Sequence, residues 1–286
     1  MHKLTPPDFS ALDVLKNSIA NSCDEQKSKL QDQTLRTALL NAEQTYVHYL
    51  QAGQAWQVPK SDDVAGVLTK DDALSIYEEM KDLPFRNATA AELLYKNARL
   101  TRCAYCGHNQ PRNLDHYLPK YKYVEYAFCP VNLVPACDAC NTFAGGKGKL
   151  LPRSAGEFFY HPYFDDPDDG RWLKVVMSVT ESGLDVHFET QKPIRWSNEK
   201  YGRIEYTFKK LKLSKMYSEA VLADISARRT VLGRLFDLQG GGGLATHFGS
   251  IATDYLADCP NGWIPIAYEY LSCHQEVCDA YRSWQI

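Results

Sequence analysis

The sequence predicts a mostly helical α+β protein, and three patterns support this fold class. Apolar residues recur every three or four positions in the first and last thirds of the 286-residue chain, which favours amphipathic helices. Apolar and polar residues alternate from Leu184 to Glu189, which is typical of a half-buried β-strand. Two Cys-x-x-Cys pairs near the middle of the chain indicate a compact module between the helical flanks.

Residues 1–98 are expected to form an N-terminal helical region. Its clearest helix carries one apolar stripe, made of Leu35, Leu39, Ala42, Tyr46 and Tyr49. The run Thr-Lys-Asp-Asp at 69–72 is typical of a helix N-terminal capping box, and residues 87–92 start a further helix. Residues 53–65, which include a proline and several polar residues, favour a loop.

Three further segments follow in chain order. Residues 99–150 hold the cysteine module, and residues 151–196 hold a turn-rich stretch and a hairpin with strands at 172–180 and 184–190. Residues 197–286 are expected to be helical again, with a flexible break at the four glycines 240–243. Basic residues outnumber acidic ones from 199 to 215, which indicates a phosphate-contacting stripe or, more simply, a solvated helix face.

The charge distribution points to a local contact with phosphates. The whole chain has a formal net charge of −3, which is unusual for a protein that binds nucleic acid unaided. Residues 96–153, however, contain nine Lys or Arg residues and only three acidic residues. A basic region in an acidic chain suggests phosphate contact with help from a partner.

Hydropathy and the N-terminus favour a cytoplasmic protein that does not span a membrane. No apolar run approaches the ~20 residues that a membrane helix needs, and residues 1–7 lack the apolar region of a signal peptide. In the cytoplasm, cysteines stay reduced or bind metal.

The two cysteine pairs predict a structural zinc site with the ligands Cys103, Cys106, Cys137 and Cys140. Each pair places two sulfurs on one tight turn, and Gly107 permits the positive φ that such turns often need. The other cysteines are interpreted as buried thiols: Cys23, Cys129, Cys259, Cys273 and Cys278. A second metal site from Cys259, Cys273, His274 and Cys278 is disfavoured, because the spacing is poor for one helical face.

Polar residues around the second cysteine pair resemble the active-site motif of the HNH endonuclease family. Asp115 and His116 are adjacent, Asn132 precedes an apolar stretch, and Asn141 directly follows Cys140. These residues are similar, in order, to the Asp-His, the central Asn and the third polar residue of the ββα-metal motif. The four cysteines are similar to its zinc-stapled subset. The resemblance implies a ββα-metal core stapled by a four-cysteine zinc site.

The resemblance implies a role for each of these side chains. His116 would act as the general base, because an imidazole titrates near neutral pH. Asp115 and Asn141 would offer oxygen ligands to a catalytic Mg²⁺ or Mn²⁺, and Asn132 would steady the hairpin and orient the base. Because successive strand residues point to opposite faces, Asp115 and His116 can converge on one phosphate only if the strand ends or bends there.

Four further residues are candidates for substrate contact: Lys120, Lys147, Lys149 and His161. The lysines could hold phosphates or could be solvated loop residues, and the sequence favours neither interpretation. His161 could face the cleft, although a histidine packed beside Pro162 and Tyr163 is the favoured interpretation.

A narrower resemblance concerns bacterial anti-phage systems. Residues 114–120, 132–137 and 161–165 are similar to the PtuB-type HNH nucleases of Septu, including retron-associated versions. This resemblance implies an SMC/ABC-type ATPase partner of the PtuA type. The sequence therefore predicts a metal-dependent HNH endonuclease that hydrolyses nucleic acid, with DNA favoured. Two alternatives stay open: cleavage of RNA such as tRNA, and a zinc-dependent docking module that cuts nothing.

Overall fold

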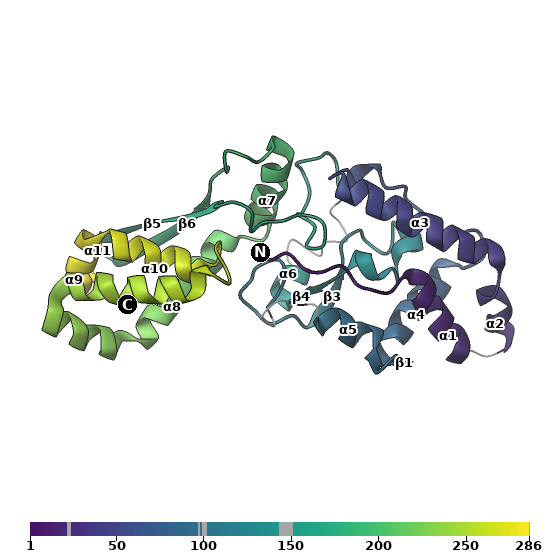
Figure 1. Ribbon diagram of the computed structural model, residues 1–286, viewed down its shortest axis with the longest axis horizontal. Helices are drawn as coiled ribbons and strands as arrows, with labels where there is room; N and C mark the ends of the chain where they lie inside the picture. The colour runs from purple at the N-terminus through teal and green to yellow at the C-terminus, as the bar shows by residue number, and fades with distance from the viewer. Residues whose placement is uncertain (22–23, 97, 99–101, 143–150, 286) are drawn as a thin grey trace. The chain divides into compact units, whose positions relative to one another are not determined.

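The computed structural model describes residues 1–21, 24–96, 98, 102–142 and 151–285 (Figure 1). The chain divides into two compact units: unit 1 comprises residues 1–166 and 198–207, and unit 2 comprises residues 167–197 and 208–286. In the described residues, strands pair as three separate two-stranded antiparallel sheets among many helices, so the predicted mixture of helices and small sheets is confirmed. Over the same ranges, no helix combines the length and apolar character needed to cross a lipid bilayer.

The first part of unit 1 is helical, as the apolar spacing predicts. Its helices are α1 (Ala11–Asn21), α2 (Asp24–Leu30), α3 (Gln33–Gln51), α4 (Lys70–Asp82) and α5 (Ala90–Lys96), with a 3-10 turn η1 at Ala55–Gln57. Asp32 caps α3 by accepting hydrogen bonds from the N–H groups of Thr34 (2.6 Å) and Leu35 (3.2 Å). The buried stripe of α3 ends at Leu50 rather than at Tyr49, because Leu50 continues the four-residue spacing from Tyr46.

The capping box predicted at residues 69–72 is present at the start of α4. Thr69 Oγ1 accepts the Asp72 N–H at 3.2 Å, and Asp72 Oδ2 accepts the Thr69 N–H at 2.9 Å. The chain then passes through the small sheet of β1 (Pro84–Phe85) and β2 (Ala88–Thr89) into α5, which packs against α4. These two helices form one wall of the pocket described below.

The cysteine module contains an antiparallel pair of strands, β3 (Asn113–His116) and β4 (Leu133–Ala136), followed by the short helix α6 (Asp138–Thr142). The register pairs Asn113 with Ala136 and His116 with Leu133. The connection between the strands contains two 3-10 turns, η3 (Val124–Tyr126) and η4 (Pro130–Asn132). The chain order is therefore strand, strand, helix.

An aromatic segment after the module is buried within unit 1. Tyr160 is fully buried, and its N–H donates to Thr207 Oγ1 of α7 (Asn198–Lys210) at 2.9 Å. Arg203 of α7 pairs with Asp165 through two contacts of 2.5 and 3.0 Å, and both side chains are nearly buried. Arg203 therefore serves packing rather than a phosphate-contacting stripe at 199–215.

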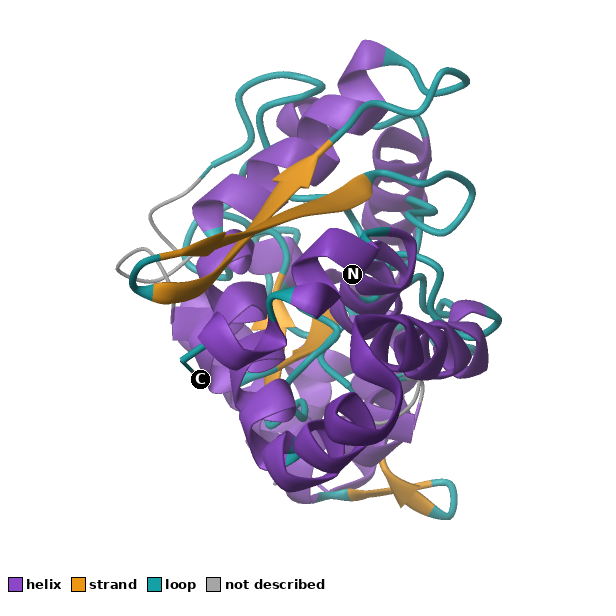
Figure 2. Cartoon of the chain, turned by 90° about the vertical axis from the view of Figure 1, so that its left-hand side faces the viewer, coloured by secondary structure: helices purple, strands orange, loops and turns teal. Residues whose placement is uncertain are grey.

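A long hairpin forms the β part of unit 2 (Figure 2). It consists of β5 (Leu173–Thr180) and β6 (Gly183–Thr190), which pair from Leu173 with Thr190 to Thr180 with Gly183. The strands expected at 172–180 and 184–190 are confirmed to within one residue. Burial alternates along both strands, as the sequence predicts for the second one, because α8 (Leu213–Ala227) packs on β6 and α10 (Trp263–Cys273) packs on β5.

The other helical segments of unit 2 are α9 (Arg229–Leu256), α11 (Gln275–Asp279) and the 3-10 turn η6 (Tyr281–Ser283). The glycine run 240–243 kinks α9 instead of forming a loop between two helices. Gly240 alone leaves the helical region within α9, with φ 64° and ψ −162°. Gly241 permits close packing, since a Cβ there would lie 2.6 Å from the backbone nitrogen of Asp279.

Candidate metal centre and adjoining pocket

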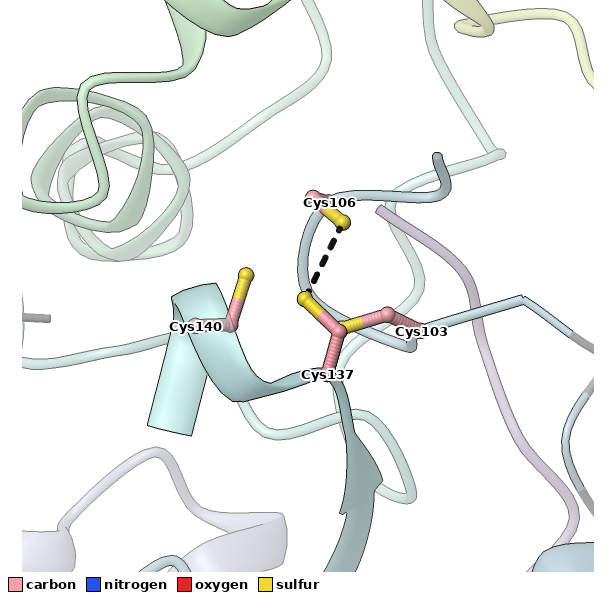
Figure 3. Close-up of side chains that lie close together, drawn as sticks. All are labelled: Cys103, Cys106, Cys137 and Cys140. Carbon is pink, nitrogen blue, oxygen red and sulfur yellow. Dashed lines mark hydrogen bonds between the residues drawn. The ribbon is translucent and has the colours of Figure 1, made fainter. Parts of the chain in front are cut away.

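The four cysteines of the two pairs come together in unit 1 (Figure 3). Cys103 and Cys106 lie on the turn before β3, Cys137 directly follows β4, and Cys140 lies in α6. Their Sγ atoms all lie within 4.8 Å of one another, and those of Cys106 and Cys137 are 3.9 Å apart. Sulfurs bound to one tetrahedral zinc ion are about 3.8 Å apart, since each Zn–S bond is about 2.3 Å. The four-cysteine group therefore fits a metal ion such as zinc.

The turn of the first pair is shaped by Gly107. This residue has a φ of +63°, and its N–H donates to the Cys103 carbonyl at 2.8 Å. A Cβ at this position would also lie 2.7 Å from the His2 ring, so packing as well as conformation requires glycine. The N–H of His108 donates to Cys106 Sγ at 3.5 Å, a contact that stabilises a thiolate.

Two thiols of the group, Cys106 and Cys137, have a lowered pKa. Hydrogen bonds from neighbouring thiols, with that of Cys103 the strongest influence, lower the pKa of both Cys137 and Cys106. Burial raises the pKa of Cys103 itself. Hydrogen bonds to Cys103, Cys106 and Cys137 raise the pKa of Cys140, so negative charge gathers on two of the four sulfurs, and thiolates are the form that binds metal.

The cysteines outside the group form no second cluster among the residues that the structure describes. Cys278 donates to the Leu271 carbonyl at 3.3 Å, and burial raises its pKa to about 12. Cys129 is buried, as expected, whereas Cys273 is exposed because it ends α10 at the surface, and Cys259 is half-buried. Cys23 lies outside the described residues.

A cavity of about 470 Å³ lies beside β3, lined by residues of α4, α5, β3 and α6. It brings together three residues that the sequence singles out: His116, Lys120 and Asn141. Arg112 and Lys81 also line it, whereas Glu92 is the one acid among the described lining residues and already accepts the Thr89 N–H at 2.8 Å. The pocket is therefore basic and suited to an anion.

Some lining residues carry no clear sequence signal. Tyr77 and Lys81 lie four residues apart on α4, so they share one face of that helix, but only tertiary packing brings this face to β3. Tyr95 of α5 reaches the pocket in the same way. The helical spacing of Tyr77 and Lys81 predicts that they share one face of α4, but it does not predict that they lie near His116.

His116 is oriented by the backbone of the β3–β4 connection. Its Nε2 lies 2.8 Å from the Ala127 carbonyl, which can only accept, so Nε2 carries the hydrogen and Nδ1 keeps its lone pair. The Tyr77 ring packs edge-on against the imidazole, with ring centroids 4.5 Å apart. Burial lowers the pKa of His116 to about 3, so the ring is neutral at pH 7. The neutral ring keeps a lone pair that can accept a proton, but a pKa this low makes it a weaker base than the near-neutral imidazole expected from the sequence.

Asp115 does not join His116 in lining this pocket. Its side chain is 3% exposed and lies close to Tyr105, whose pKa it helps to raise after the larger effect of burial. β3 ends at His116, but Asp115 precedes that end, so the alternation of the strand separates the two side chains. The Asp115 charge still acts on Tyr77 in the pocket wall, whose pKa burial and nearby acids raise.

Asn132 is fully buried and holds the β3–β4 connection together. Its Oδ1 accepts the Leu118 N–H at 2.7 Å and the Tyr46 hydroxyl at 3.0 Å. Its Nδ2 donates to the carbonyls of Leu118 (3.1 Å) and Tyr126 (3.0 Å). Tyr126 directly precedes Ala127, so the network fixes the carbonyl that orients His116.

The other candidates for substrate contact are His161, Lys147 and Lys149. His161 is 1% exposed, does not line the pocket, and has its Nε2 3.1 Å from the Tyr46 hydroxyl. Its Nδ1 accepts the Tyr163 N–H at 3.2 Å, so the favoured interpretation of a packed histidine describes its surroundings. Lys147 and Lys149 lie outside the described residues.

Comparison with known proteins shows that part of the chain is similar to a phage protein. Over 160 residues, the chain is 31% identical to Protein ea31 of Escherichia phage lambda. The matched region covers 54% of this chain, and the chain spans about half the length (52%) of that phage protein. No family model matches the chain, and no solved structure matches it.

Proposed function

We propose that the protein is a metal-dependent endonuclease of the HNH type, which hydrolyses phosphodiester bonds of nucleic acid, with DNA as the favoured substrate. The observation that carries this proposal is the meeting of His116, Lys120 and Asn141 in one basic pocket. The order of β3, β4 and α6 beside a four-cysteine group supports the same proposal, because the zinc-stapled ββα-metal motif has this order.

Two kinds of metal ion have separate places in this proposal. Zinc would be held by the four cysteines, whose Sγ atoms lie within 4.8 Å of one another, and it would fix the fold of the module. Mg²⁺ or Mn²⁺ would be held by the oxygen donors Asn141 and Asp115, and it would supply positive charge that stabilises the phosphoryl oxygens. Of these two donors, Asn141 has the direct support, since it lines the pocket and Asp115 does not.

The side chains of the pocket provide the proton chemistry of hydrolysis. Nδ1 of His116 accepts a proton from a water molecule, whose oxygen forms a bond to phosphorus as the bond to the leaving 3′ oxygen breaks. The leaving oxygen takes a proton from solvent. Lys120 and Arg112 place positive charge near the phosphate oxygens.

A plasmid-nicking assay tests the proposal. The zinc-loaded protein is expected to nick supercoiled DNA when Mg²⁺ or Mn²⁺ is added and not when both are omitted. His116→Ala is expected to slow nicking by roughly 10²–10⁴-fold, while His187→Ala, a change of an exposed histidine of β6, leaves the rate unchanged. Labelled tRNA in parallel reactions separates DNA from RNA cleavage. Zinc-loaded protein that cleaves neither substrate would contradict the proposal and favour the docking module.

The defence role and the partner belong to the same proposal. They are supported by the resemblance of residues 114–120, 132–137 and 161–165 to Septu nucleases, which implies a PtuA-like SMC/ABC-type ATPase. Co-expression of the chain with such an ATPase should give a complex that survives size-exclusion chromatography. Separate elution of the two proteins, with no effect of the ATPase and ATP on cleavage, would contradict this part.

A further inference from the structure

Lysines and tyrosine rings alternate along one stretch of unit 1. The Nζ of Lys70 lies 4.9 Å from the centroid of the Tyr121 ring, and that of Lys120 lies 5.7 Å from the same ring. On the Tyr77 ring, Lys120 and Lys81 lie 4.4 and 4.3 Å from the centroid. These five residues, from α4 and the turn after β3, are called the Lys–Tyr ladder.

The ladder ends at the candidate active site. Tyr77, Lys81 and Lys120 all line the same cavity as His116, and the Tyr77 ring is the one that packs against the imidazole. A strand bound along the ladder would therefore bring a phosphate to the candidate base.

The two rings of the ladder differ in exposure. Tyr77 is 5% exposed and is used in packing, whereas Tyr121 is 54% exposed. An exposed ring flanked by cations is the combination that proteins use to stack an unpaired base while they hold its backbone. A paired base within a duplex has no free face for such a ring.

Glu78 currently neutralises the inner end of the ladder. Its carboxylate lies 2.5 Å from Lys81 Nζ and 3.8 Å from Lys120 Nζ, so one anion serves two cations. The Glu78 side chain is 60% exposed, and water can hydrate it when the lysines turn to another anion. A phosphodiester offers two oxygens of the same charge type.

We propose that the Lys–Tyr ladder is a track for an unpaired nucleic-acid strand, in which Tyr121 stacks on a base and Lys81 and Lys120 exchange Glu78 for a phosphate next to His116. The cleavage that this positioning serves rests on the proposed function, whereas the binding does not. Unpaired DNA and unpaired RNA share the required chemistry.

Binding measurements on the full chain test the track. The zinc-loaded His116→Ala protein, which holds substrate without cutting it, is titrated into labelled oligo(dT), oligo(U) and a DNA duplex at several salt concentrations. Tyr121→Ala is expected to weaken binding of the unpaired strands by roughly fivefold or more, and of the duplex much less. Replacing both Lys81 and Lys120 by Met should reduce the slope of log Kd against log salt by about 1.4, or about 0.7 per lysine.

Two further variants distinguish a loss of binding from a loss of the folded structure. Glu78→Gln should tighten binding of the unpaired strands by roughly threefold, a gain that misfolding cannot produce. Lys16→Met, a change of a 54% exposed lysine of α1, should leave every Kd unchanged. The preference between oligo(dT) and oligo(U) assigns the strand to DNA or RNA.

The outcomes separate the track from the proposed function. Unpaired-strand binding that depends on Tyr121 and Glu78, in a wild type that cleaves nothing, supports the track and contradicts the nuclease. Two results would overturn the track while the wild type still cleaves nucleic acid: Tyr121→Ala leaves the Kd for unpaired strands unchanged, or it weakens binding of the duplex and of unpaired strands equally. Either result would leave the proposed nuclease activity uncontradicted. No binding of any oligonucleotide overturns the track as well.

Discussion

The four-cysteine group and the histidine pocket share the β3–β4–α6 segment, yet they differ in their access to solvent. Every cysteine of the group is 3% exposed or less, and their sulfurs face one another. The pocket beside them keeps about 470 Å³ open. Structural metal sites are closed by their ligands, whereas sites of chemistry keep a position open. Under the proposed function, the closed sulfur group would stabilise the module and the open pocket would contact the substrate.

The two regions are also fixed by different forces. The sulfurs need an ion to balance thiolate charge, whereas His116 is held by the Ala127 carbonyl and, through the connection, by Asn132. Loss of metal binding by the cysteines and loss of the Asn132 hydrogen bonds should both disturb the pocket, but to different extents.

Removal of a sulfur ligand should have the largest effect. Cys137→Ser leaves three thiolates without a complete ligand set, and zinc binding at such sites is worth on the order of 10 kcal/mol of folding free energy. We expect residues 102–142 to lose protection from hydrogen exchange and the zinc content to fall. Cys273→Ser, at an exposed cysteine, should change neither quantity. Unchanged hydrogen-exchange protection of residues 102–142 in the Cys137→Ser protein would show that metal binding by the cysteines does not stabilise the module.

Asn132→Ala should have the next largest effect. It removes four hydrogen bonds and leaves buried groups of Leu118 and Tyr126 without their partner, which costs about 3 kcal/mol. Urea unfolding should show this loss while zinc content is retained. Asn41→Ala, at an exposed position of α3, is the matched control and should lose nothing. An unchanged stability would mean that the connection is held without Asn132.

The proposed ligands of the catalytic ion should give a smaller, ion-dependent effect. Asn141→Ala is expected to raise the Mg²⁺ concentration for half-maximal nicking by about tenfold. Asp115→Asn should raise it too if the carboxylate turns to the pocket when the ion binds. If Asp115→Asn leaves the Mg²⁺ concentration for half-maximal nicking unchanged, Asp115 is not a ligand of the ion, and Asn141 remains the proposed ligand.

The pH dependence of stability should give the smallest effect. The pKa of His116 is about 3 in the folded chain and 6.5 at its ordinary value, so between these values the unfolded chain binds a proton that the folded chain does not. The stabilisation is therefore complete above pH 6.5 and is lost progressively as the pH falls towards 3. The unfolding free energy of His116→Ala should fall less steeply over this range than that of the wild type or of His187→Ala. Equal slopes would contradict a neutral His116.

The sequence predicted the cysteine group because metal ligation demands fixed residue types at short spacing, and Gly107 marks the turn. It also predicted the capping box at Thr69 and the β5–β6 hairpin, since both depend on local patterns. It did not predict the wall of the pocket formed by Tyr77 and Lys81, which reaches β3 only through helix packing. The burial of Arg203 against Asp165 likewise depends on a contact between distant segments.

The most direct test of the central claim measures zinc content and nicking rate together. The claim is that zinc bound by the four cysteines keeps the pocket residues in the arrangement that cleavage needs, without contacting the substrate. As zinc is withdrawn in steps at saturating Mg²⁺, the nicking rate should fall in proportion to the zinc that remains, and added zinc should restore it. Protein depleted of zinc that still nicks DNA at the full rate would contradict the account.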